Sequence, residues 1–122
     1  MHQAKETLPK TIDVPGVSVQ SKNWGNMTVS YIKMAAGVDF TPVLKGLPDD
    51  LCHCPHWGYV IKGQILLKYL DGSEERVTSG QLFYWPVGHT AIFEEETEYI
   101  ELSPQKEMSE LLEHAERQMA AA

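Results

Sequence analysis

The sequence predicts an all-β domain that ends in one α-helix. Between residues 10 and 103, short apolar segments alternate with turns rich in Gly, Pro and Asp. Their spacing of about eight to twelve residues is typical of β-sandwiches and β-barrels. Residues 104–122 instead carry apolar side chains at helical spacing. The length of 122 residues suits one domain with its own core and is too short for two.

The first half of the chain contains short strand signals. Residues 1–9 lack a core pattern and are predicted to form a flexible arm. Strands are expected at residues 11–14, 17–19 and 27–32. The pair Pro15-Gly16 supplies a turn between the first two strands. Residues 46–50 combine glycine, proline and aspartate and are predicted to form a loop.

The second half has clearer signals. Strands are expected at residues 59–61, 64–70, 76–78, 82–85, 90–93 and 99–102. The pair Asp71-Gly72 indicates a hairpin, because both central residues of such a turn need positive φ. Ser103 is predicted to cap a helix whose first residue is Pro104. One face of this helix is apolar and is expected to pack on the β-domain or on a second subunit: Met108, Leu111, Leu112, Ala115 and Met119.

The composition argues against several classes of partner. Acidic residues outnumber basic ones by 17 to 10, and the net charge of -7 disfavours binding to a nucleic-acid backbone. The start of the chain lacks the apolar region of a signal peptide, and no apolar run reaches the roughly 20 residues of a membrane span. We therefore expect a cytoplasmic protein without a nucleic-acid or membrane partner.

Residues 52–56 read CHCPH and hold both cysteines and two of the five histidines of the chain. In an extended strand, Cys52, Cys54 and His56 share one face and His53 takes the other. Cysteines in a cytosolic chain are more often free, catalytic or metal-bound than paired. A Cys52–Cys54 disulfide is disfavoured, because such neighbours lie about 6.5–7 Å apart. The alternative interpretation is that these side chains only pack in the core.

Two turns carry a more specific signal. Gly80, Pro86 and Gly88 form the pattern G-x5-P-x-G, and Gly63 closes the segment that follows the CHCPH cluster. In these residues, the chain from residue 38 to 103 resembles the cupin superfamily. That resemblance implies a small single-domain, RmlC-like jelly-roll barrel (a double-stranded β-helix) over residues 10–103, which often holds one metal ion.

The metal-ligand positions of that family are altered in this chain. His56 stands at the position of the glutamate of the first motif, and Cys52 and Asp50 stand at the positions of its two histidines. Ala91 occupies the position of the histidine of the second motif, and His89 lies two residues earlier. The frame of the family is thus retained with another ligand set, so no activity of the family is transferred to this chain.

The resemblance also places the two motif segments on neighbouring strands, where thiolates and imidazoles could bind one divalent transition metal, with zinc or iron expected. The predicted ligands are Cys54, His56 and His89, with Cys52 as the fourth ligand and Asp50 as the alternative to Cys52. Three alternate residues of a straight strand span about 13 Å, too far for one ion. Either one residue is not a ligand or the strand bends, which Pro55 favours.

Other residues near the motifs are candidates for the wall of a pocket that accepts a small organic ligand: Asp50, Tyr59, Tyr84, Phe93 and Glu101. Two functions follow. The first is a metal-dependent enzyme that uses the ion as a Lewis acid or to activate water or oxygen. The second is a non-enzymatic module that binds or senses a metal or a small molecule. Enzyme status stays open, and a barrel with a purely oligomeric role would bind no metal. Exposed edges of the N-terminal strands predict a homodimer.

Overall fold

The computed structural model describes residues 1–121 as two antiparallel sheets and one helix. The six-stranded sheet has the order β1-β2-β3-β10-β5-β8, and the four-stranded sheet has the order β4-β9-β6-β7. The strands are β1 (Lys10–Val14), β2 (Val17–Trp24), β3 (Met27–Met34), β4 (Val38–Asp39), β5 (His56–Lys62), β6 (Gln64–Tyr69), β7 (Glu74–Thr78), β8 (Leu82–Trp85), β9 (His89–Phe93) and β10 (Thr97–Pro104). The helix α1 (Gln105–Ala121) follows β10 directly.

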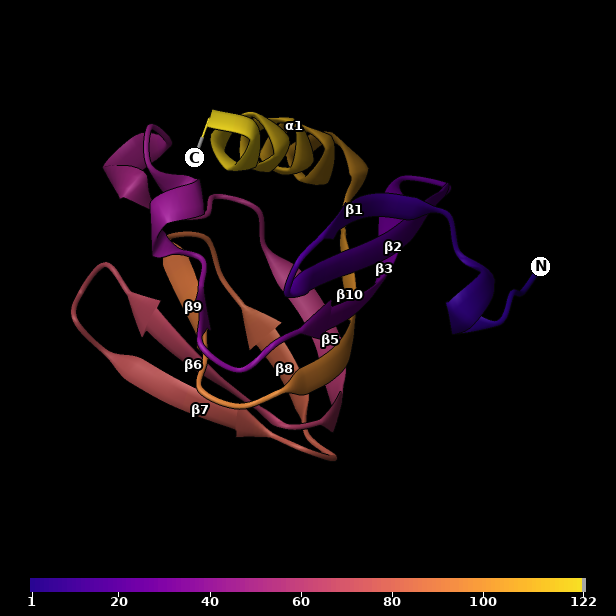
Figure 1. Ribbon diagram of the computed structural model, residues 1–122, viewed down its shortest axis with the longest axis horizontal. Helices are drawn as coiled ribbons and strands as arrows, with labels where there is room; N and C mark the ends of the chain where they lie inside the picture. The colour runs from indigo at the N-terminus through magenta and orange to yellow at the C-terminus, as the bar shows by residue number, and fades with distance from the viewer. Residues whose placement is uncertain (122) are drawn as a thin grey trace.

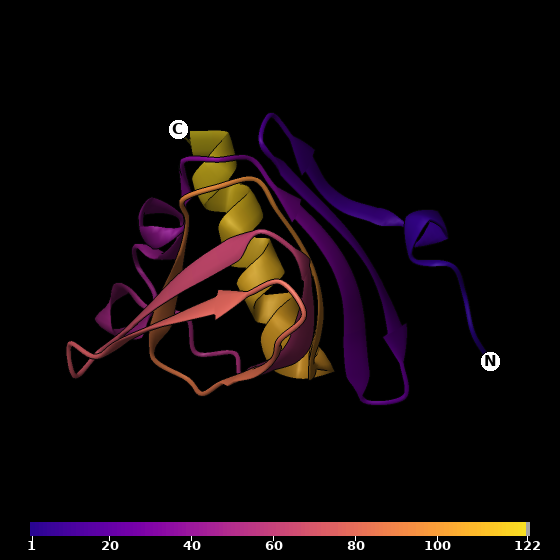
Figure 2. The same ribbon diagram turned by 90° about the horizontal axis from the view of Figure 1, so that it is seen from below.

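The two sheets face each other and form a barrel, and α1 lies across one open end of it (Figures 1 and 2). Short 3-10 helices at Thr41–Leu44 and Pro48–Asp50 precede β5, and the first of them packs beside α1. The prediction of an all-β barrel with one C-terminal helix is confirmed. No helix within residues 1–121 has the length and hydrophobicity of a membrane span.

The core fills the space between the sheets and continues under α1. The largest fully buried apolar side chains are Trp85, Phe93, Leu44, Ile65, Leu67 and Val60. The ring of Phe83 stacks on that of Trp85 with centroids 3.9 Å apart, and Tyr99 stacks on Phe93 at 5.9 Å. From the helix, Met108 and Ala115 complete the buried set. Because α1 supplies this apolar cover, the open end of the barrel is closed to solvent.

Several strands are longer than their apolar signals. β2 continues to Trp24 through the polar run Gln20–Asn23, because each of its residues from Val17 onward pairs with a residue of β3. β5 likewise begins at His56 rather than at residue 59, since His56 and Trp57 pair with Trp85 and Tyr84 of β8. Backbone pairing with a neighbouring strand thus extends a strand beyond the segment that side-chain alternation reveals.

The start of the helix differs from the prediction by one residue. Pro104 ends β10, and α1 begins at Gln105. The predicted cap, Ser103, is fully buried in the strand, and its hydroxyl contacts His56 instead of the helix terminus. A buried imidazole therefore takes the hydroxyl that the local sequence offers to the helix. Residue 122, the last of the predicted helix, lies outside the described residues.

The N-terminal nine residues, predicted to be a flexible arm, precede β1 and contact β2. They contain a 3-10 helix at Lys5–Thr7, and Leu8 is buried. The side-chain amide of Gln20 donates hydrogen bonds to the carbonyls of Glu6 (2.9 Å) and Leu8 (2.8 Å). These bonds hold the arm across the outer face of β2, which the apolar pattern alone does not reveal.

Gly58 lies at the centre of β5, between β10 and β8. Its φ is not in the left-handed region, so the residue is not required for a turn. A Cβ atom at this position would collide with the carbonyl oxygen of Ile100 and with the ring of Phe83. Glycine is therefore required because the neighbouring strand and an aromatic ring approach the backbone closely.

Candidate metal centre

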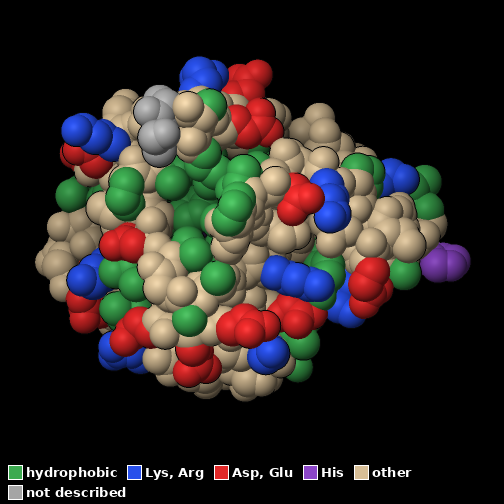
Figure 3. All heavy atoms as spheres, in the orientation of Figure 1, with side chains coloured by type: hydrophobic (Ala, Val, Ile, Leu, Met, Phe, Trp, Pro, Cys, Tyr) green, Lys and Arg blue, Asp and Glu red, His purple; other side chains and the backbone are tan. Residues whose placement is uncertain are grey.

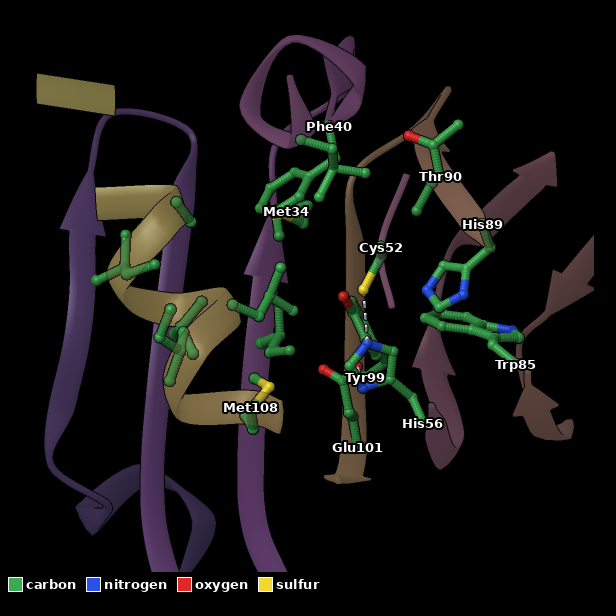
Figure 4. Close-up of a pocket in the computed structure, with 18 of the residues that line it drawn as sticks. Met34, Phe40, Cys52, His56, Trp85, His89, Thr90, Tyr99, Glu101 and Met108 are labelled. Atoms are coloured by element: carbon green, nitrogen blue, oxygen red, sulfur yellow. Dashed lines mark hydrogen bonds and ion pairs between the residues drawn. The ribbon is translucent and has the colours of Figure 1, made fainter. Parts of the chain in front are cut away.

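Three buried side chains converge at the closed end of the barrel. Cys52, His56 and His89 each offer a ligand atom, and these atoms all lie within 4.8 Å of one another. Figure 4 shows the thiol and the two imidazoles directed toward one another beneath Phe40. The backbone joins the two motif segments, because the amide of Cys52 donates a hydrogen bond to the carbonyl of His89 (2.8 Å). The predicted proximity of the two segments is therefore present.

The chain between Cys52 and His56 is bent. In a straight strand, residues four positions apart lie about 13 Å apart, but Sγ of Cys52 and Nε2 of His56 are separated by 3.6 Å. β5 begins only at His56, and Cys52 pairs with His89 through an isolated bridge. The bend next to Pro55 brings both side chains into one site.

His56 is held by two neighbours on β10. Its Nδ1 lies 2.6 Å from Oε1 of Glu101 and 2.7 Å from the hydroxyl of Ser103. All three side chains are buried. An Nδ1–H that donates to the carboxylate leaves Nε2 directed at Cys52, and a metal ion bound there would take the place of any proton on Nε2. A histidine whose second nitrogen is bonded to a carboxylate is the usual arrangement of a metal-binding imidazole.

His89 is oriented in the same way by the backbone. Its Nδ1 lies 2.7 Å from the carbonyl oxygen of Pro86, to which it can donate a hydrogen bond. Pro86 belongs to the G-x5-P-x-G turn, so this turn fixes the tautomer of the histidine that follows it. The Nε2 atom is then the nitrogen available to a metal. Both histidines therefore have an oriented Nδ1 and an available Nε2.

The electrostatics of the group favour a thiolate at Cys52. Burial raises the pKa of its thiol, but contacts with His56 and His89 outweigh this effect and bring the pKa down to about 6 from an ordinary value of 9.0. Burial lowers the pKa of His56, whereas the charge of Glu101 and the two thiols raise it well above its usual range. For Cys54, burial dominates and raises the pKa. Only Cys52 is poised to act as a thiolate ligand.

We expect this difference to be measurable in metal-free protein. The ultraviolet absorbance of a thiolate should appear with a midpoint near pH 6, because Cys52 ionises there. The same transition should be lost in Cys52→Ser and retained in Cys54→Ser, since burial keeps Cys54 protonated to higher pH. A transition that disappears in Cys54→Ser instead would contradict the assignment.

The predicted ligand Cys54 does not belong to the three-residue group. It is buried with Leu44, Cys52 and Met108, and its thiol lies 3.5 Å from the carbonyl oxygen of Pro55. Both cysteines are free, so they do not form a disulfide. Alternation placed Cys54 on the same face as Cys52, and both are buried in one cluster. The bend brings only Cys52 into the group with His56 and His89, because alternation applies only to an extended strand.

The other predicted site residues fall into two groups. Phe93 and Glu101 line the cavity beside the cysteine and the histidines. Asp50, Tyr59 and Tyr84 do not. Asp50 is exposed and accepts a hydrogen bond from the amide of Gly46 (2.9 Å), whereas Tyr59 and Tyr84 point outward from the large sheet. His53 is exposed, as alternation predicts.

The cavity next to the three side chains has a volume of about 60 Å³ and lies between them and α1. Its wall is mostly apolar: Ile12, Val19, Ile32, Met34, Phe40, Leu44, Trp85, Ala91, Phe93, Met108, Leu111, Leu112 and Ala115, with Thr90, Tyr99 and Glu101 as further polar members. Tyr99, Thr90 and Ser103 were not predicted at the site. Alternation from Tyr99 through Glu101 to Ser103 was the signal that could have found two of them.

A second hollow opens on the surface near the C-terminal end of α1, where Figure 3 shows hydrophobic side chains gathered. Its volume is about 570 Å³, and it is lined by Val14, Pro15, Val17, Val38, Asp39, Phe40, Pro42, Val43, Gln118 and Met119. Phe40 lines both this hollow and the inner cavity. Phe40 therefore lies between the buried cavity and the surface hollow.

No protein-family model and no curated protein matches the sequence. Solved structures do match the fold. An RmlC-like cupin from Shewanella frigidimarina shares 16% identity at a TM-score of 0.61, over 84% of this chain and 88% of that one. Ectoine synthase from P. lautus shares 11% sequence identity at a TM-score of 0.63, over 86% of this chain and 78% of that one. KdgF from Halomonas sp. shares 22% sequence identity at a TM-score of 0.57, over 78% of this chain and 84% of that one. At these identities the likeness concerns the fold, and function must be argued from the site.

Proposed function

Because this chain has the fold of the RmlC-like cupins, we propose that it binds one divalent transition-metal ion through Cys52, His56 and His89. The observation that carries the proposal is the shared orientation of the two imidazoles. Each holds its Nδ1 against an oxygen, Glu101 for His56 and Pro86 for His89, and so has Nε2 available beside a thiol.

The spacing of these atoms fits a metal. Zn–S and Zn–N bonds of tetrahedral zinc imply a distance of about 3.6 Å between a sulfur and a nitrogen ligand. Sγ of Cys52 and Nε2 of His56 lie 3.6 Å apart. A thiolate with two imidazoles suits zinc or iron(II) better than magnesium or calcium, which prefer oxygen ligands. We propose zinc as the first choice and iron as the second.

Three protein ligands leave one coordination position for a ligand or water, which is the arrangement of catalytic zinc sites. Neither of the other predicted ligands belongs to the three-residue group: Cys54 is buried beside it, and Asp50, the predicted alternative, is exposed. Oε1 of Glu101 is already held by His56. The cavity adjoins all three ligands, so a bound molecule could reach the ion from there.

The cavity walls define the class of this molecule. Among the described residues that line it, none is Lys or Arg, so no ammonium or guanidinium group is present to bind a phosphate or carboxylate group. Tyr99 and Glu101 offer polar groups beside the ion site, and the opposite wall is apolar. With about 60 Å³ of space, the site suits a small neutral molecule with an oxygen or sulfur atom for the metal. A bound metal would supply Lewis acidity to that atom.

A non-catalytic metal-binding or small-molecule-binding module is the second candidate function. The small cavity, covered by Met108, Leu111 and Leu112 of α1, favours this alternative, because it restricts exchange with solvent. The two candidates differ in the accessibility of the fourth position. In cobalt-substituted protein, an added small thiol should shift the d–d absorption if that position is open and leave it unchanged if the site is closed.

Cobalt also tests the ligand set. We expect close to one equivalent of Co²⁺ per chain and a thiolate-to-cobalt charge-transfer band, because Cys52 ligates the ion. The band should be lost in Cys52→Ser and retained in Cys54→Ser, whose sulfur is outside the group. Failure of the wild-type protein to take up cobalt or zinc would overturn the proposed function, and a band that depends on Cys54 would overturn the ligand set.

A further inference from the structure

Tyr99 is a buried tyrosine on the inner face of β10. Side chains two positions apart share one face of a strand, so Tyr99 lies in the same row as Glu101 and Ser103, and all three are buried. Tyr99 also lines the cavity together with Cys52 and the two histidines of the site. Figure 4 shows it between Cys52 and Glu101. Its side chain is therefore part of the wall that faces the proposed metal site.

The ring of Tyr99 is held in place by three other aromatic rings. It stacks on Phe93 of β9 with centroids 5.9 Å apart, and the rings of Phe83 and Trp85 of β8 lie at 6.2 Å and 5.9 Å. β10 is itself paired on both sides, with β3 and β5. The packing of the core thus fixes the position of the hydroxyl before any molecule binds, as a group that recognises a ligand requires.

The hydroxyl of Tyr99 differs from those of two other tyrosines. Tyr31 donates a hydrogen bond to Glu98, and Tyr69 donates one to Glu75. Within residues 1–121, no side chain or backbone group makes such a bond with the hydroxyl of Tyr99. The hydroxyl of a buried tyrosine usually has a hydrogen-bond partner. Because Tyr99 lines the cavity, we expect that partner to be a molecule bound there.

The surroundings of Tyr99 make its hydroxyl a donor. Burial raises the pKa of this hydroxyl well above its usual range, and the nearby charges of Glu101 and Cys52 raise it further. The hydroxyl therefore keeps its proton at neutral pH. A carboxylate and a thiolate, in contrast, can only accept hydrogen bonds. Tyr99 thus supplies the hydrogen-bond donor that its two charged neighbours cannot supply.

Two other polar side chains of the cavity wall are less suited to this role. The hydroxyl of Thr90 already shares a hydrogen bond of 3.1 Å with that of Thr41. The indole nitrogen of Trp85 is without a partner in the described part of the chain, but Figure 4 shows it at the end of the ring that is farther from Cys52. Among the described residues of the wall, Tyr99 is therefore the best placed donor.

We propose that the hydroxyl of Tyr99 donates a hydrogen bond to the metal-bound atom of the molecule that enters the cavity. Tyr99 is then a residue that determines specificity, and it is not itself a ligand of the ion. This inference rests on the proposed metal site and adds the chemical class of the molecule that binds there. The site should favour a molecule whose coordinating atom still carries a lone pair after it has bound the ion.

Sulfur and oxygen ligands meet this requirement. A thiol, an alcohol or a carbonyl compound coordinates through an atom that keeps a second lone pair, which can accept the hydrogen bond of Tyr99. An amine uses its single lone pair for the bond to the metal, so it cannot accept that hydrogen bond. A site built to make a hydrogen bond discriminates against a molecule that cannot make it. Tyr99 should therefore favour thiols over amines of the same size.

Cobalt-substituted protein tests this inference, with methanethiol and methylamine as two probes of similar size. Methanethiol binds as the thiolate and releases its proton to the buffer, and methylamine binds as the free base. The d–d absorption gives the dissociation constant of each probe at one fixed pH. In Tyr99→Phe, the constant for methanethiol should rise at least about 10-fold, because a hydrogen bond to a charged acceptor is lost. The constant for methylamine should stay the same.

Tyr69→Phe is the matched control. The ring of Tyr69 lies 6.4 Å from that of His89, but its hydroxyl donates to Glu75, and Tyr69 does not line the cavity. We expect both probes to bind this variant as they bind the wild-type protein. Tyr99→Phe should also melt at the wild-type temperature, since the hydroxyl that it removes makes no hydrogen bond within the described chain. Weaker thiol binding at unchanged stability separates a role in recognition from a structural one.

The outcomes separate this inference from the metal proposal. A wild-type protein that takes up no cobalt overturns both. Full cobalt uptake without any response to methanethiol overturns this inference alone, as do equal thiol constants in the wild-type protein and Tyr99→Phe. An equal loss of affinity for both probes would mean that Tyr99 does not distinguish sulfur from nitrogen. A cobalt spectrum that changes in Tyr99→Phe before a probe is added would identify Tyr99 as a ligand of the ion and would also contradict the proposal.

Discussion

Replacing His89 by alanine is expected to lower zinc affinity by more than about 100-fold, because removal of a ligand should cost more than the 10- to 100-fold lost with an outer-shell partner. His89 is preferable to His56 for this experiment. Within residues 1–121, the hydrogen bond of the His89 side chain is to the carbonyl of Pro86, whereas loss of His56 would leave the buried Glu101 without its partner. The fold should therefore survive His89→Ala, and a competition titration with a metal-sensitive dye measures the effect.

His53→Ala is the matched control for this prediction. The rings of both histidines contact one backbone carbonyl, at 2.7 Å for His89 and 2.8 Å for His53. They differ in position, because His89 is buried within the three-residue group and His53 is exposed outside it. We expect His53→Ala to bind zinc like the wild-type protein. Equal losses in the two variants would mean that neither histidine binds the ion at this site.

A second large effect is expected from Gly58→Ala, which should lower the free energy of unfolding by at least about 3 kcal/mol. The added methyl group would meet the carbonyl oxygen of Ile100 and the ring of Phe83. The ring cannot move away freely, because it stacks on Trp85 at 3.9 Å. Strand β10 would have to shift, although it is paired on both sides by β3 and β5. Chemical denaturation followed by circular dichroism gives the change in stability.

Gly25→Ala separates steric collision from the general cost of replacing glycine. Gly25 has a φ of +60°, and no atom lies within 4 Å of the position of an added Cβ. Its replacement should cost about 1 kcal/mol, from the left-handed backbone conformation alone. A stability loss in Gly58→Ala no greater than that in Gly25→Ala would show that β10 and Phe83 can accommodate the methyl group.

Local patterns were sufficient for the order of the elements. Residues 82–85 were predicted as a strand with the bounds that β8 has. Asp71-Gly72 marks the turn between β6 and β7, although Gly72 has positive φ and Asp71 does not. Turn chemistry and two-residue alternation are properties of neighbouring residues, so they can be read without the fold. The ends of β2 and β5 were misjudged, because backbone pairing with β3 and β8 extends them through residues that lack the apolar pattern.

The chemical character of the site was also visible in the sequence. The cluster CHCPH and the G-x5-P-x-G turn singled out His56 and His89, which the barrel brings together with Cys52. The alternation of side chains along a strand could not show which of Cys52 and Cys54 is the ligand, because both would lie on the same face of an extended strand. The choice depends on the bend before His56, which lets Cys52 pair with His89 and leaves Cys54 in the same buried cluster but outside the three-residue group.

The partners of the ligands came from parts of the chain that no local pattern connects. Glu101 and Ser103 support His56 because β10 lies next to β5 in the sheet, although more than 40 residues separate them from it in sequence. Because of this register, Ser103 contacts His56 instead of capping the helix. For the same reason, there is no room for a side chain at Gly58. Residue types and local turns are properties of the chain, whereas convergence depends on the register between distant strands. That register is set by the packing of the whole core and not by any single segment.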